Sequence, residues 1–125
     1  MKRKILIVED NVGLSQIQKD WLSRAGYDAV TAMSEPIARS LIRKTQFDLI
    51  LSDVRLPEGD GISLLEWLRK EKKDIPFIIT TEYVSVPDVV RTIKLGARDY
   101  LPKPVHRDYL LELAEDIFHP VATVR

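Results

Sequence analysis

Cysteine is absent from this 125-residue sequence, and so is any excess of charge, because 19 basic side chains balance 19 acidic ones. Without cysteine, the chain can form neither a disulfide framework nor a thiolate metal site. Without net positive charge, it lacks the electrostatic footprint of a free-standing nucleic-acid-binding protein. We therefore expect no direct nucleic-acid binding by this chain.

Long hydrophobic runs are absent as well. No apolar run approaches the roughly 20 residues that a membrane-spanning helix needs, and the basic start at residues 1–4 is followed by too short an apolar stretch for a signal peptide. We expect a cytoplasmic protein without a membrane segment. The length fits one domain, which we place at residues 1–120, with 121–125 as a tail or the start of a linker.

Short β-branched runs alternate along the chain with longer amphipathic segments. Strands are predicted at residues 5–8, 28–31, 49–51, 77–81 and 99–101. Between and after them, apolar residues recur at helical spacing, near residues 14–25, 37–42, 62–68, 86–93 and 110–118. Strict alternation of this kind predicts an α/β fold in which helices cover both faces of a parallel sheet.

Polar residues follow the predicted strands. They are Glu9 and Asp10 after the first strand, Asp53 after the third, Thr81 at the end of the fourth and Lys103 after the fifth. In open parallel sheets, ligands bind beyond the carboxyl ends of the strands. Three carboxylates, a hydroxyl and an ammonium group are therefore expected to meet at one edge of the sheet.

The chemistry of that set points to a metal-assisted phosphoryl acceptor. Clustered carboxylates repel one another unless a cation lies among them, and oxygen ligands alone favour Mg²⁺, or Mn²⁺ in its place. A carboxylate beside such a metal can attack phosphorus and form an acyl phosphate. Lys103 and Thr81 would then supply positive charge and a hydrogen-bond donor to the new phosphoryl oxygens.

In this order and spacing, the motifs of residues 4–118 resemble the receiver domain of bacterial two-component response regulators. The motifs are Glu9-Asp10, Leu51-Ser52-Asp53, Leu56-Pro57 with Gly59-Asp60-Gly61, Thr81, the run from Gly96 to Tyr100, and Leu101-Pro102-Lys103-Pro104. The resemblance implies a flavodoxin-like, doubly wound (βα)5 fold with strand order 2-1-3-4-5. It also suggests a cis peptide bond before Pro104.

The resemblance further implies a Mg²⁺-dependent phosphorelay. Asp53 would accept a phosphoryl group from the phosphohistidine of a sensor histidine kinase. Asp10, Asp53 and the backbone carbonyl of Arg55 would ligate the metal directly, and Glu9 would act through water. Such a domain is a phospho-accepting switch and not an enzyme that turns over a substrate.

The same resemblance assigns phosphate binding to Thr81 and Lys103, and a switching role to Thr81 together with Tyr100. The expected output is control of an output domain or protein partner, with a possible homodimer through the fourth helix, fifth strand and fifth helix. Residues 75–104 most resemble receivers of the nitrogen-regulation enhancer-binding type, which would make transcription the controlled process.

Three residues near the predicted site depart from the family pattern or add bulk to it. Glu82 stands where the family usually has Ala or Gly, so we hypothesise that it restricts small phosphodonors; alternatively, it points to solvent or pairs with Arg55 or Lys103. Arg55 and Tyr83 either shield the acyl phosphate from water or lie on the surface.

Two other functions remain as alternatives at this point. One is a receiver-like interaction module that is not phosphorylated in use, which Glu82 keeps open. The other is an aspartyl-phosphate hydrolase of the haloacid-dehalogenase type, which needs a second Asp where this chain has Arg55. A dinucleotide or flavin site is excluded, because the first strand is followed by carboxylates and not by a glycine-rich turn.

Overall fold

The computed structural model describes residues 2–120, so the predicted tail at 121–125 lies outside the described residues. Five parallel strands form the main sheet: β1 (Lys4–Val8), β2 (Asp28–Ala32), β3 (Leu49–Asp53), β6 (Phe77–Thr81) and β7 (Asp99–Pro102). Their order is β2-β1-β3-β6-β7, which confirms the predicted order because β6 and β7 are its fourth and fifth strands.

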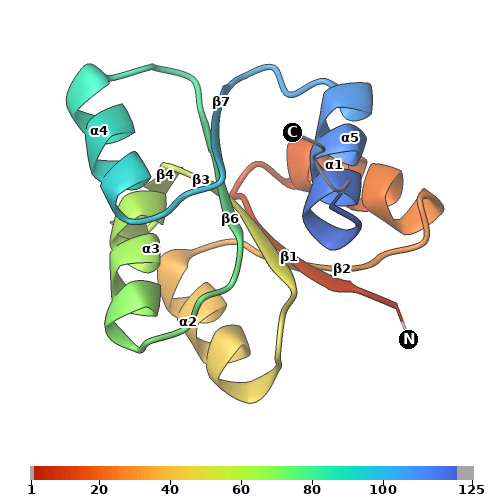
Figure 1. Ribbon diagram of the computed structural model, residues 1–125, viewed down its shortest axis with the longest axis horizontal. Coiled ribbons are helices and arrows are strands. Elements are labelled where there is room, and N and C mark those ends of the chain that lie inside the picture. The colour runs from red at the N-terminus through yellow and green to blue at the C-terminus, as the bar shows by residue number, and fades with distance from the viewer. Residues whose placement is uncertain (1, 121–125) are drawn as a thin grey trace, which may run out of the picture.

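Helices cover both faces of this sheet, as predicted. They are α1 (Val12–Arg24), α2 (Glu35–Lys44), α3 (Gly61–Lys70), α4 (Val86–Lys94) and α5 (Arg107–Phe118). In Figure 1, α1 and α5 lie together on one side of the sheet, and α2, α3 and α4 lie on the other. Among residues 2–120, no helix has the length and apolar character needed to cross a membrane.

The central strands are mostly apolar because each of their faces packs against a helical layer. Successive residues of β1 alternate between two cores: Leu6 and Val8 join the one under α2 and α3, whereas Ile5 and Ile7 join the one under α1 and α5. All four side chains are at most 1% exposed. This double burial fixes the register of the sheet, and with it the positions of the residues that follow each strand.

Two short strands that the sequence did not predict lie between β3 and α3. Strands β4 (Arg55–Leu56) and β5 (Gly59–Asp60) pair in antiparallel fashion, with Arg55 opposite Asp60. Residues 55–60 thus form a small hairpin. Asp60 then caps α3, because its side chain accepts a hydrogen bond from the Ser63 backbone at 2.7 Å.

Helix α4 leaves most of its apolar side chains exposed. Val86, Val90 and Ile93 are 73%, 45% and 65% exposed, although they recur at helical spacing. Such a stripe usually faces the core, so the pattern alone would have predicted burial here. Within the described chain, nothing covers this stripe, and Ile93 also lines a groove between α4 and β7.

Candidate functional site

Strand register brings the predicted site residues to one edge of the sheet. Val8 of β1 lies opposite Ser52 of β3, so Glu9 and Asp53, the residues that follow them in the sequence, are neighbours at the carboxyl edge. On the other side of β3, Asp53 lies opposite Thr80. Thr81 in turn lies opposite Pro102, the residue before Lys103. The sequence-predicted residues therefore converge as the parallel-sheet argument required.

Three carboxylates form the acidic part of the site. One oxygen each from Glu9, Asp10 and Asp53 lies within 4.8 Å of the other two. Glu9 and Asp53 are only 2% and 7% exposed, whereas Asp10 faces solvent. An all-oxygen donor set of this size, open on one side, fits a hard divalent cation such as Mg²⁺. The residues present are therefore compatible with the predicted metal.

Lys103 bridges the two buried carboxylates. Its ammonium nitrogen lies 2.8 Å from Glu9 Oε1 and 2.8 Å from Asp53 Oδ2, and its side chain is only 10% exposed. Burial by itself lowers the pKa of Lys103, but its hydrogen bonds to Asp53 and Glu9 outweigh burial and raise the pKa above the ordinary value. Lys103 is therefore positively charged across the physiological range. The Lys103–Pro104 peptide bond is cis, as the resemblance suggested.

The surroundings of Glu9 favour its neutral form over its charged form. Burial raises its pKa above the ordinary carboxyl value, and the nearby charge of Asp53 raises it further. Hydrogen bonds from Lys103 and from the Asn11 backbone, at 3.0 Å, oppose this shift without cancelling it. The bond to Asn11 lies at the start of α1, so Glu9 both lines the acidic site and helps to fix the helix that follows it.

Thr81 is buried, and its hydroxyl is engaged with the loop after β6. It donates to the Tyr83 carbonyl at 2.9 Å and accepts from the Tyr83 backbone N–H at 3.1 Å. In this arrangement, the hydrogen of the hydroxyl is directed to the loop and not to the carboxylates. The sequence predicted that Thr81 lies at this edge of the sheet but gave no sign of this partner.

Tyr100, the predicted partner of Thr81 in switching, lies on β7 beside Ile79 of β6. Its side chain is half-buried, and its hydroxyl is shielded from solvent without a hydrogen-bond partner among the described residues. A buried hydroxyl without a partner costs about 1–3 kcal/mol. The ring also closes part of a groove between α4 and β7, of about 530 Å³, that is lined chiefly by apolar side chains.

Arg55 and Tyr83 form a contact across the edge of the site. The guanidinium carbon of Arg55 lies 5.0 Å from the centre of the Tyr83 ring, and both side chains are exposed. The Arg55 backbone N–H also donates to Asp53 Oδ1 at 3.4 Å. Glu82 directly follows β6, and its side chain is exposed. Among residues 2–120 it makes no ion pair with Arg55 or Lys103.

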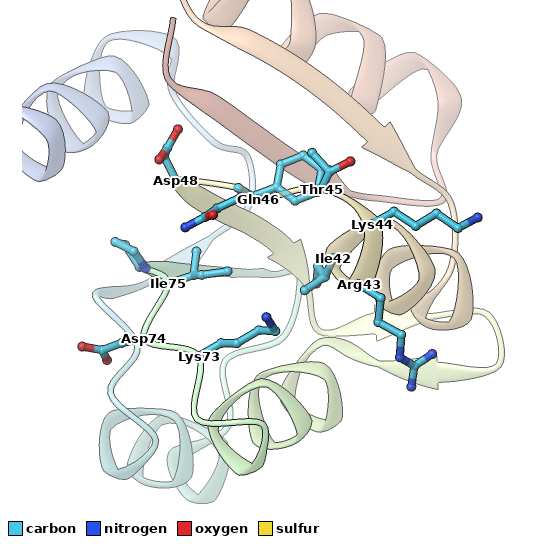
Figure 2. A pocket seen from close by; sticks show the side chains of 11 residues that line it. Ile42, Arg43, Lys44, Thr45, Gln46, Asp48, Lys73, Asp74 and Ile75 are labelled. Atoms are coloured by element: carbon cyan, nitrogen blue, oxygen red, sulfur yellow. The ribbon is translucent and has the colours of Figure 1, made fainter. Parts of the chain in front are cut away.

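A second hollow, of about 650 Å³, lies at the opposite edge of the sheet. It is bordered by residues 42–48 and 73–76, which precede β3 and β6. Figure 2 shows that the charged ends of Arg43, Lys44 and Asp74 point away from one another and do not converge on a common centre. The site at the carboxyl edge, where three carboxylates and an ammonium group meet, is therefore the candidate on which we concentrate.

Comparison with known proteins identifies the class of this site. The response regulator receiver domain family matches residues 5–115. The chain belongs to this family. Receiver domains of two-component systems act in phosphorelay signalling: they bind Mg²⁺ at an acidic pocket, and they work with histidine kinases and output domains. The acidic cluster of Glu9, Asp10 and Asp53 lies at the corresponding edge of this sheet.

Curated relatives are longer receiver-containing regulators. The chain is 40% identical over 114 residues to the transcriptional regulatory protein ZraR of Salmonella typhimurium, covering 91% of this chain and 26% of that protein. It is 34% identical over 112 residues to the response regulator protein PilR of Pseudomonas aeruginosa, covering 90% of this chain and 25% of that protein. The receiver thus spans about a quarter of the length of these relatives.

Solved receiver structures share the whole fold. A CheY-like receiver domain from Methanospirillum hungatei superposes with a TM-score of 0.89 at 31% identity, covering 94% of this chain and 95% of that one. The non-phosphorylated HemR receiver domain of Leptospira biflexa gives a TM-score of 0.88 at 34% identity, covering 99% of this chain and all of that one. The predicted flavodoxin-like fold is therefore confirmed.

Proposed function

We propose that Asp53 is the phosphoacceptor of this receiver, and the Lys103 bridge is the observation that carries the proposal. An ammonium group held 2.8 Å from Asp53 Oδ2 fixes one oxygen of the carboxylate and lies where charge on an incoming phosphoryl group would develop. Among residues 2–120, the other oxygen, Oδ1, accepts only the long bond of 3.4 Å from the Arg55 backbone N–H. One oxygen is thus better placed for nucleophilic attack than the other.

The proposed reaction transfers a phosphoryl group from the phosphohistidine of a sensor kinase. An Asp53 oxygen forms the new bond to phosphorus as the phosphorus–nitrogen bond breaks, and the bonding electron pair returns to the imidazole of the kinase. Glu9, Asp10, Asp53 and the Arg55 backbone carbonyl would hold Mg²⁺, with Glu9 acting through water and Mn²⁺ as a substitute. The bound metal would neutralise charge on the phosphoryl oxygens.

Conformational switching follows from the rearrangement of hydrogen bonds that the phosphoryl group would favour. The Thr81 hydroxyl now donates to the Tyr83 carbonyl, and a phosphoryl oxygen is a stronger acceptor because it is charged. Transfer of this bond would pull Thr81 toward the site and alter the packing around Tyr100. The equilibrium between the two states then shifts, as in other ligand-driven switches.

The output proposed for this receiver is control of a transcriptional regulator. ZraR carries that description, and both ZraR and PilR extend far beyond the receiver. The proposed contact surface is the face formed by α4, β7 and α5, which includes the exposed apolar stripe of α4. It would contact either an output domain or a second copy of this chain. Residues 1–120 would form the receiver unit, with the following residues leading out of it.

Phosphorylation tests the main proposal directly. Incubation with acetyl phosphate and Mg²⁺, followed by mass spectrometry, is expected to add one phosphoryl group to the wild type and none to Asp53→Asn. Removal of Mg²⁺ with a chelator should abolish the adduct. Modification of Asp53→Asn to the same extent as the wild type would contradict the assignment.

A receiver-like interaction module remains a second candidate because Glu82 exposes a carboxylate at the entrance to the site. A negative charge there repels an incoming phosphoryl donor. We expect Glu82→Ala to be labelled faster by acetyl phosphate than the wild type. Equal rates would show that Glu82 does not restrict small phosphodonors. No adduct with acetyl phosphate or beryllofluoride in either protein would favour the module.

Arg55 and Tyr83 are proposed to prolong the life of the acyl phosphate. Arg55 begins β4 just after β3, and Tyr83 lies in the loop after β6, so the two side chains meet beside the strands that carry Asp53 and Thr81. This position would hinder a water molecule that approaches the phosphoryl group. The half-life of phosphorylated Asp53 should shorten in Arg55→Ala, and an unchanged half-life would rule out shielding.

A further inference from the structure

The hairpin β4–β5 lies directly against the phosphoacceptor strand. It begins two residues after Asp53, and the Gly61 backbone N–H at its end donates to the Val54 carbonyl at 2.8 Å. A Cβ atom added to Gly61 would overlap the Asp53 carbonyl oxygen, so glycine is required for this close approach. The position of the hairpin and the position of the phosphoacceptor are therefore linked.

So small a hairpin needs support from outside. Each of its strands has two residues, and an isolated two-stranded hairpin is at best marginally stable in water. Its first strand nevertheless carries the Arg55 carbonyl, which the proposed function uses as a metal ligand. A ligand that belongs to the backbone can be placed only by fixing the backbone itself.

Glu35 supplies such support from a different element. It is the first residue of α2 and only 5% exposed, although it is a carboxylate. Its Oε1 atom accepts a hydrogen bond from the Asp60 backbone at 2.9 Å, and Asp60 lies opposite Arg55 in the hairpin. Gly59 makes this approach possible, because a Cβ atom there would overlap the Glu35 carboxylate.

The second oxygen of Glu35 is also anchored. It pairs with Arg39, one turn later in α2. The guanidinium carbon of Arg39 lies 5.1 Å from the centre of the Trp67 ring on α3. Glu35 is thus fixed by α2 and α3 together while its other oxygen holds the hairpin. Burial of a carboxylate is costly unless it is paired and hydrogen-bonded, and here both conditions are met.

We propose that Glu35 is a positioning residue for the metal site, acting through Asp60 and the hairpin on the carbonyl of Arg55. This inference rests on the proposed function, because it takes Arg55 to be a metal ligand. Glu35 lies outside the acidic cluster, and its sequence context shows only an acidic residue in the first turn of a helix. Its role is to hold the backbone and not to touch the metal or the phosphoryl group.

Two substitutions separate positioning from plain structural support. Glu35→Met keeps most of the volume but has no oxygen to accept the Asp60 N–H, whereas Glu35→Gln keeps that acceptor and loses only the charge. Glu35→Met removes one partner of the ion pair with Arg39, whose side chain is 32% exposed, and so also lowers stability. Glu35→Ala serves as the second variant without an acceptor, should Glu35→Met fail to fold.

Metal affinity is the deciding measurement. Calorimetric titration with Mg²⁺ is expected to show binding about tenfold weaker in Glu35→Met than in the wild type, the lower end of the range for partners that orient metal ligands. Glu35→Gln should stay within about threefold of the wild type, because its amide oxygen still accepts the Asp60 N–H. In metal-free protein, the backbone amide resonances of Arg55 and Asp60, which lie opposite each other in the hairpin, should shift in Glu35→Met.

The matched control is Asp20→Ala in α1. Asp20 makes the same kind of ion pair, four residues before Arg24, on an exposed helix surface. This variant should bind Mg²⁺ as the wild type does. Wild-type affinity in Glu35→Met would overturn the positioning role. Failure of the wild-type protein to bind Mg²⁺ would instead overturn the proposed function, so the two failures are distinguishable.

Discussion

Replacement of Lys103 by methionine tests the electrostatics of the site most directly. The substitution keeps a long apolar side chain but removes the ammonium group that lies 2.8 Å from both Glu9 and Asp53. The two carboxylates, 3% and 9% exposed in their side chains, are then left facing each other without a counter-charge. Such a pair is unfavourable because it is both desolvated and of like charge.

The separation of the two carboxylates sets the size of the expected loss of stability in Lys103→Met. The relevant oxygens of Glu9 and Asp53 lie within 4.8 Å of each other. At an effective dielectric constant of about 20, two unit charges at that distance repel each other by about 3.5 kcal/mol. We therefore expect Lys103→Met to lower the free energy of unfolding by about 3 kcal/mol at pH 7.5 in the absence of metal.

The direction of the pH dependence follows from Glu9. Its pKa is already raised by burial, and the loss of Lys103 removes an interaction that lowers it. An acid with a raised folded-state pKa favours the fold when protonated, and this stability is lost as pH rises through that pKa. The difference between Lys103→Met and the wild type should therefore shrink as pH falls toward the ordinary carboxyl value.

Urea unfolding followed by circular dichroism provides the assay, with chelator or with saturating Mg²⁺. Added Mg²⁺ should restore much of the lost stability, because the metal supplies the missing positive charge. Lys4→Met is the control, since Lys4 pairs with Asp28 at 3.7 Å on the exposed surface; we expect a change below about 1 kcal/mol there. A loss in Lys103→Met that is independent of both pH and Mg²⁺ would refute this reasoning.

Three further substitutions test neighbouring parts of the site. Glu9→Gln should stabilise the metal-free protein in urea unfolding at neutral pH, because burial raises the pKa of Glu9 and the neutral form is preferred, and should weaken Mg²⁺ binding in calorimetry. Gly61→Ala should lower the free energy of unfolding by about 1–3 kcal/mol, because its Cβ would overlap the Asp53 carbonyl; wild-type stability would contradict that overlap. Thr81→Val should still be phosphorylated on Asp53. In the wild type, switching is expected to alter the packing of Tyr100 and hence its fluorescence, and this change should be lost in the variant. A change equal to that of the wild type would argue against a switching role for the Thr81 hydroxyl.

The sheet and the site could be predicted from sequence because both depend on local patterns. A short apolar run buried on two faces is recognisable without any knowledge of the rest of the chain. The residue after each run is then placed at the carboxyl edge by the geometry of parallel strands. Glu9, Asp53 and Lys103 were found in this way, and their side chains do meet.

The finer contacts could not be predicted because they depend on loops and on distant elements. Nothing in the sequence around Thr81 shows that its hydroxyl bonds to the Tyr83 backbone. Glu35 follows a capping serine and precedes a proline, which is typical of an exposed acid in the first turn of a helix. It is buried because Asp60, 25 residues later, brings the hairpin over it.

Helix α4 shows a different limit of pattern analysis. Its apolar spacing correctly predicted a helix, and the helix begins where Ser85 caps it by accepting from the Asp88 backbone at 3.4 Å. The same spacing indicates only that one face is apolar, and not which surface covers it. In the structure, Val86, Val90 and Ile93 remain exposed.

The overall balance of 19 positive and 19 negative side chains conceals a site that is strongly unbalanced. With its carboxylates ionised, the cluster of Glu9, Asp10 and Asp53 carries two more negative charges than Lys103 offsets, which is the charge that a divalent cation supplies. Phosphorylation of Asp53 would add further negative charge at the same place. Lys103 is already bonded to both buried carboxylates, whereas the Thr81 hydroxyl is bonded to a backbone carbonyl of the loop after β6. On the proposed mechanism, the charge added at Asp53 would draw the Thr81 hydroxyl away from Tyr83 and move the adjoining loop.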